Sequence, residues 1–126
     1  MKKERISTEK APKAIGPYSQ GQKIGDLVFT SGQIPINPAT GVLATEIKEA
    51  TKQSLENVKA ILEAAGSSLD NVIKTVVYLK NMDDFAAVNE IYGTYFNENP
   101  PARSCVQVGK LPMDALVEIE AIGSLV

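Results

Sequence analysis

Residues 72–108, VIKTVVYLKNMDDFAAVNEIYGTYFNENPPARSCVQV, decide the fold of this chain. The run 72–80 is rich in β-branched and aromatic residues, which predicts a strand. Asn81 or Asp83 can cap the helix that follows, and two prolines end it before a second predicted strand at 102–108. The helix carries an apolar stripe formed by Phe85, Val88, Ile91, Tyr92, Tyr95 and Phe96. Strand, helix and strand in this order predict a β-α-β unit.

The flanking sequence adds one more helix and more strands. Apolar residues recur at three- and four-residue spacings over 46–65, which predicts a helix, and Gly66 follows where a helix C-cap is expected. Further strands are expected at 18–24, 27–30 and 116–122. The pattern predicts a single α+β domain over residues 1–126, with a mixed sheet.

The apolar pattern of two predicted strands indicates that several copies of the chain assemble. The runs 27–30 and 72–79 are apolar on both faces, so both faces of the sheet should be buried. Two helices can cover only one face. Another copy of the chain is the simplest cover for the second face, which predicts a homo-oligomer.

Composition narrows the functional classes. The chain has 126 residues and a formal net charge of -2, which argues against nucleic acid as a partner. No apolar run is long enough to cross a bilayer, so no membrane partner is expected. The N-terminus is polar and there is one cysteine, which together suggest a cytoplasmic location.

The chain contains no histidine. This excludes Ser-His and Cys-His nucleophile pairs and histidine-ligated metal sites, and one cysteine cannot build a thiolate cage. An all-carboxylate magnesium site stays open, but no metal and no cofactor are expected. Any chemistry must use arginine, carboxylates, hydroxyls, backbone groups and water.

Arg103 is the most unusual residue of the second predicted strand. Side chains alternate across a strand, so Arg103 shares a face with Cys105 and Gln107. A guanidinium on a buried strand needs an anionic partner, and its donor fork suits a carboxylate. That carboxylate could belong to a ligand, or to a nearby Glu or Asp in a structural salt bridge.

Other polar residues are individually ambiguous. Glu118 and Glu120 share one face of the last strand, where they could act as acid and base or form a solvated face. Cys105 lacks a histidine to lower its pKa and is not expected to be a nucleophile. The remaining candidates are most simply structural or solvated when each is taken alone: Tyr18, Ser31, Gly32 and Asn89.

Together these residues lie in longer motifs. They occur in IGPYSQG, FTSGQIPINPATG, QSLENVKAILEAAG, PPARSCVQVGKLP and VEIEAI, in this order along the chain. The series resembles the RidA (YjgF) family of enamine/imine deaminases from about residue 6 to residue 122. The link NENPP, at 97–101, looks about two residues shorter than in some members, which puts the preferred substrate size in doubt.

The resemblance implies a chorismate-mutase-like fold of about six strands with two helices on one face. Three copies would pack their sheets into a central barrel, with sites between subunits. The implied activity is hydrolysis of 2-aminoacrylate and 2-iminobutanoate-type acids to 2-keto acids and ammonia, which protects pyridoxal-phosphate enzymes from damage. Two alternatives remain: a regulatory protein that senses small carboxylates, and a translation inhibitor directed at RNA.

The resemblance also assigns roles within one cleft. Arg103 falls on the carboxylate-binding arginine, and we expect Glu118 to move a proton. Substrate-binding positions are implied for Tyr18, Ser31, Gly32, Asn89 and Cys105.

Overall fold

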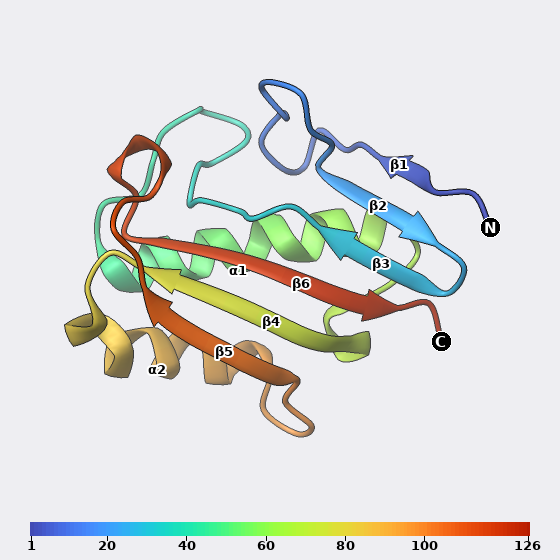
Figure 1. Ribbon diagram of the computed structural model, residues 1–126. Helices are drawn as coiled ribbons and strands as arrows, with labels where there is room; N and C mark the ends of the chain where they lie inside the picture. Colours follow the sequence, from blue (N-terminus) through green and yellow to red (C-terminus); the bar gives the residue numbers. More distant parts are fainter.

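The computed structural model describes residues 1–126 as one mixed sheet with two helices (Figure 1). The helices are α1 (Ile47–Ala64) and α2 (Phe85–Tyr95). The strands are β1 (Glu4–Ile6), β2 (Gly21–Ile24), β3 (Leu27–Thr30), β4 (Val72–Leu79), β5 (Ala102–Gln107) and β6 (Val117–Ser124). Three short 3₁₀ turns occur at Leu69–Asn71, Met82–Asp84 and Pro112–Asp114.

The sheet has six strands in the order β1-β2-β3-β6-β4-β5. Only β4 and β5 pair in parallel, and α2 connects them along the chain. Both helices lie on the same side of the sheet, behind it in the view of Figure 1. The predicted α+β domain with a mixed sheet of about six strands and two helices on one face is therefore confirmed.

The first helix agrees with the sequence pattern at both ends. The Glu46 carboxylate accepts hydrogen bonds from the backbone N–H groups of Lys48, at 2.8 Å, and Glu49, at 3.3 Å. Such a cap satisfies donors that have no partner within the helix. Gly66 follows the last turn with φ +90°, a conformation that glycine adopts without strain. The buried face of α1 then supplies much of the core, through Ala50, Leu55, Val58, Ile61 and Leu62.

The N-terminal region departs from prediction in two places. The strand β1 was not expected, because its first two residues are exposed and only Ile6 is buried. The strand expected from residue 18 begins only at Gly21, so 18–20 form a loop. The buried Gln20 side chain holds this loop by accepting from the Thr8 N–H, at 2.7 Å, and by donating to three carbonyls, including that of Pro12 at 2.7 Å.

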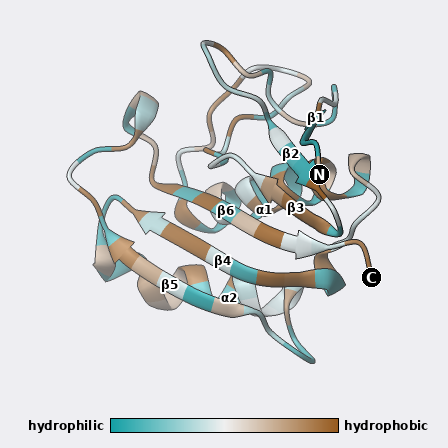
Figure 2. Ribbon diagram, turned by 45° about the vertical axis from the view of Figure 1, so that its right-hand side comes forward, coloured by the Kyte–Doolittle hydropathy of each residue, from teal (hydrophilic) through white to brown (hydrophobic).

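The face of the sheet away from the helices is uncovered. Apolar side chains lie open on it, with Leu27 and Phe29 each 39% exposed and Val106 45% exposed. Figure 2 shows how apolar residues are distributed along the central strands. A face of this kind is typical of a surface that meets a partner. Neither helix has the combination of length and apolar character that a membrane span requires.

Candidate active site in two halves

Arg103 lies on the helix side of the sheet, at the edge strand β5. Its register partner on β4 is Thr75, which is 1% exposed and belongs to the core face. The guanidinium reaches back over α2, and its Nη1 donates a hydrogen bond to Asn89 Oδ1 at 2.7 Å. Asn89 was expected to be solvated when taken alone, but it is partly buried and holds the arginine.

Two aromatic rings of α2 flank the same guanidinium. Arg103 Cζ lies 4.8 Å from the centroid of the Tyr92 ring and 5.4 Å from that of the Phe85 ring. Both distances are within the range in which a cation is attracted to a ring face. The arginine is thus held by neutral groups only.

No carboxylate pairs with Arg103. The three salt bridges of the chain join Lys23 to Glu4, Lys48 to Glu90 and Lys80 to Asp114. The structural salt bridge considered for Arg103 is therefore wrong for the isolated chain. An unneutralised guanidinium with free donors is a site for an anion, and its fork fits a carboxylate.

Cys105 lies two residues along β5 on the same face as Arg103. Burial raises the pKa of the Cys105 thiol, and the nearby Arg103 charge only partly opposes this. A thiol with a raised pKa stays protonated at neutral pH and is a poor nucleophile.

Glu118 belongs to a second group, on the uncovered face. Its register partner on β4 is Tyr78, three residues from Thr75, so Glu118 and Arg103 point to opposite faces of the sheet. The Glu118 carboxylate lies against the backbone of Gly32, so closely that a Cβ at position 32 would overlap it. Gly32 is therefore needed for this approach.

The neighbouring glutamate, Glu120, has a hydrogen-bond donor. Glu120 Oε1 accepts a hydrogen bond from the Tyr78 hydroxyl at 2.6 Å, an interaction that contributes most to raising the pKa of Tyr78, to about 12. Glu118 has no such donor. Burial, and then the negative charge of Glu120, raise the pKa of Glu118. A carboxyl with a raised pKa exchanges protons more readily near neutral pH.

Tyr18 and Ser31 adjoin the Glu118 group. The Ser31 hydroxyl donates to the Ser19 carbonyl at 2.6 Å, which ties the end of β3 to the loop that carries Tyr18. Tyr18 is 53% exposed. It lines a cavity of about 220 Å³ together with Gly32, Ile34 and Met113. Thus Tyr18, Ser31, Gly32 and Glu118 form one group of candidate residues, and Arg103, Asn89 and Cys105 form the other.

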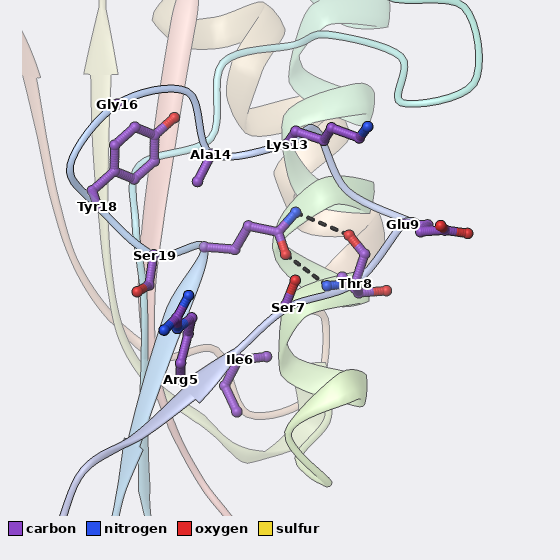
Figure 3. Close-up of a pocket in the computed structure, with 11 residues that line it drawn as sticks. Arg5, Ile6, Ser7, Thr8, Glu9, Lys13, Ala14, Gly16, Tyr18 and Ser19 are labelled. Carbon is purple, nitrogen blue, oxygen red and sulfur yellow. Dashed lines mark hydrogen bonds between the residues drawn. The ribbon is translucent and has the colours of Figure 1, made fainter.

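The largest cavity, of about 550 Å³, is also lined by Tyr18 (Figure 3). Residues of the N-terminal segment and of the loop before β2 line it, and among them Gln20 is hydrogen-bonded to the Thr8 backbone. Neither Arg103 nor Glu118 contributes to it. Neither residue lines the cavity of about 220 Å³ either.

Phe85 and Tyr92 were not recognised as neighbours of Arg103 from the sequence. The signal was present, because positions 85, 89 and 92 follow the i, i+4, i+7 spacing of one helix face. This spacing places Asn89 between the two rings. No group of three His, Cys, Asp or Glu side chains that could hold a metal ion occurs in the chain.

The fold and the site together define an α+β domain with a six-stranded mixed sheet and an arginine that no carboxylate of the chain neutralises. The family model described as Endoribonuclease L-PSP matches residues 8–124. The chain belongs to the RidA (YjgF) family.

Similar proteins cover almost the whole chain. A RutC family protein of Pyrococcus abyssi is 58% identical over 123 residues, which is 97% of each chain. A 2-iminobutanoate/2-iminopropanoate deaminase of Salmonella typhimurium is 53% identical over 120 residues, covering 93% of this chain and 94% of that protein. The crystal structure of E. coli TdcF with bound serine superposes with a TM-score of 0.92 at 49% identity, covering 96% of this chain and 98% of the other.

Proposed function

We propose that this protein hydrolyses reactive 2-imino acids, in equilibrium with their enamines, to 2-keto acids and ammonia. The observation that carries the proposal is the Arg103 guanidinium, which is held by Asn89 and two rings and is not neutralised by any carboxylate. Relatives at 52–53% identity that are named as 2-iminobutanoate/2-iminopropanoate deaminases support the same substrate class.

The site is completed by a second copy of the chain. Arg103 and Glu118 lie on opposite faces of one sheet, so they cannot act on one small molecule within a single chain. The exposed apolar residues of the uncovered face provide a surface for assembly. In the proposed homotrimer the uncovered faces form a central barrel, and Arg103 of one copy meets Glu118 of the next.

Binding of the substrate carboxylate holds C2, the carbon that reacts, in a fixed position. Arg103 holds the substrate carboxylate through two parallel hydrogen bonds, which orients C2. Tyr18, Ser31 and Gly32 of the adjoining copy form the opposite wall. Cys105 contributes its small size beside the arginine rather than its thiol, because the raised thiol pKa keeps the sulfur protonated.

The reaction needs water and proton transfer but no strong nucleophile. A water molecule attacks C2 of the C=N bond, and Glu118 accepts its proton as the C–O bond forms. The nitrogen gains protons, by way of Glu118, and leaves as ammonia while the carbinol O–H loses its proton to give the keto group. The raised pKa of Glu118 suits a group that both accepts and donates in one cycle.

The activity can be tested with 2-aminoacrylate generated in situ from serine by a dehydratase. We expect the wild-type protein to accelerate loss of the imine absorbance and Arg103→Ala to lose that acceleration while keeping its oligomeric state. Glu118→Gln should slow turnover more than it weakens binding of a 2-keto acid. Decay at the uncatalysed rate with wild-type protein would reject the proposed activity, and small carboxylates would then be screened as ligands of a sensing protein.

A further inference from the structure

The Tyr92 side chain occupies a special position beside Arg103. It is 6% exposed, and its ring lies 4.8 Å from Arg103 Cζ. Its hydroxyl shares a 2.7 Å hydrogen bond with Thr75 Oγ1. Thr75 is the register partner of Arg103 on the adjacent strand, so the ring is tied to the sheet at the level from which the arginine projects.

The Tyr92 ring also packs against a second aromatic ring of the same chain. The Phe96 ring packs against Tyr92 with centroids 4.8 Å apart at an angle of 45°. Burial raises the pKa of Tyr92, so the phenol stays neutral at working pH and adds no negative charge beside the guanidinium. Phe85, on the same helix face, provides the second ring at 5.4 Å.

We infer that Tyr92 is a positioning residue for Arg103. Its ring is fixed by the hydrogen bond to Thr75 and, together with the Phe85 ring, holds the guanidinium in one orientation. In this orientation Nη1 meets Asn89, and the other donors face the ligand carboxylate. A glutamate in place of the ring would also restrain the arginine, but it would occupy the fork and cancel its charge. An aromatic face restrains the guanidinium and leaves its in-plane donors free. This inference rests on the proposed function for the identity of the ligand, though not for the geometry of the arginine.

Tyr95 provides a matched control on the same helix. It is partly buried, and its hydroxyl donates to Glu56 Oε2 of α1 at 2.6 Å, so it resembles Tyr92 in size and anchoring. It makes no contact with Arg103 of the kind that Tyr92 makes. Tyr92→Leu and Tyr95→Leu each remove a hydrogen-bonded ring of α2. The Tyr92 ring is the more buried of the two, and only its loss removes a ring from the arginine.

The first measurement is the affinity for 2-ketobutanoate by calorimetry. We expect Tyr92→Leu to weaken binding about tenfold, as loss of a partly desolvated cation–π contact implies. Tyr95→Leu should stay within about twofold of wild type, and Tyr92→Phe within about threefold, because the phenylalanine ring still offers its face to the cation. In an Arg103→Ala background, Tyr92→Leu should cause no further loss.

The second measurement reports on the arginine without any ligand. The Nε–H resonance of Arg103 in wild-type protein should be displaced by the ring currents of the two aromatic residues. Tyr92→Leu should move it toward the position of a free arginine, and Tyr95→Leu should leave it in place. Should Tyr92→Leu fail to fold, Phe85→Leu removes the other ring and should move the resonance in the same direction.

The outcomes separate the two claims. If the Arg103 Nε–H resonance does not move in Tyr92→Leu, the positioning role is overturned, whatever the activity. Where Tyr92→Leu does not fold, the same holds for Phe85→Leu. Equal losses of affinity in Tyr92→Leu and Tyr95→Leu also overturn it, since they indicate a general loosening of α2. A moved resonance in a protein whose wild type neither binds 2-ketobutanoate nor hydrolyses the imine keeps the positioning role and rejects the proposed function.

Discussion

Two inactive variants should restore activity when their chains are mixed. Arg103→Ala removes the proposed carboxylate-binding residue, and Glu118→Gln removes the proposed proton-transferring residue. The two residues lie on opposite faces of one sheet. In the proposed assembly, each site therefore takes one residue from each of two neighbouring chains. A chain of one variant can then supply what its neighbour lacks.

The expected recovery of activity follows from the fraction of sites that combine an intact Arg103 with an intact Glu118. In an equal, random mixture, the chance that a given site has an intact Arg103 is one in two, and the chance that the next chain has an intact Glu118 is the same. About a quarter of the sites should therefore work, whatever the number of subunits in the ring. Refolding the two variants together from denaturant, followed by the 2-aminoacrylate decay assay, would give this fraction directly.

A second mixture provides the control. Wild-type chains mixed equally with chains that carry both substitutions should also show about a quarter of the sites active if sites are shared between chains, and about a half if each chain holds its own. No recovery with the two single variants, together with half-activity in this control, would refute the shared site.

The remaining predictions concern single residues. Glu120→Gln removes the negative charge that helps to raise the pKa of Glu118. Because Glu118 must be ionised to accept a proton, the acid limb of the rate–pH profile should move to lower pH, and an unmoved limb would exclude this coupling. Gly32→Ala places a methyl group where the Glu118 carboxylate lies, and we expect kcat to fall about tenfold or more in steady-state assays. Cys105→Ser should retain activity to within about threefold, since the thiol is protonated, and a folded but inactive variant would give the sulfur a role. Phe29→Asp puts a charge on the uncovered face and should yield monomers by sedimentation, with activity lost in parallel; an intact oligomer would place the interface elsewhere.

Local patterns predicted most of the regular structure. The helix expected over 46–65 is observed at Ile47–Ala64, because its apolar spacing and its glutamate and glycine ends all favour the same limits. The strand β1 escaped prediction, because it is held by backbone pairing with β2 and buries only one side chain. The loop at 18–20 could not be predicted either, since its shape depends on hydrogen bonds from Gln20 to residues eight to twelve positions away.

The site was only partly accessible to sequence reasoning. The alternation of side chains along a strand correctly predicted that Arg103 and Ser104 point to opposite faces of the sheet. The same holds for Glu118 and Val117. It could not show that the arginine meets an amide and two rings instead of a carboxylate, because those contacts join β5 to a helix. The grouping of the other candidates around Glu118 likewise depends on where β3 ends relative to β6.

The hydrogen bonds of Gln20 indicate which end of this chain can be truncated or fused to a tag without altering the proposed site. They join the segment around Thr8 and Pro12 to the residues that directly follow Tyr18, so the N-terminal dozen residues support the loop that forms one wall of the proposed site. Removing residues 1–12, or fusing a tag close to them, would therefore alter the proposed site. A tag at the C-terminus, where Val126 is 89% exposed, lies beyond the last strand and is the safer choice for preparing the protein.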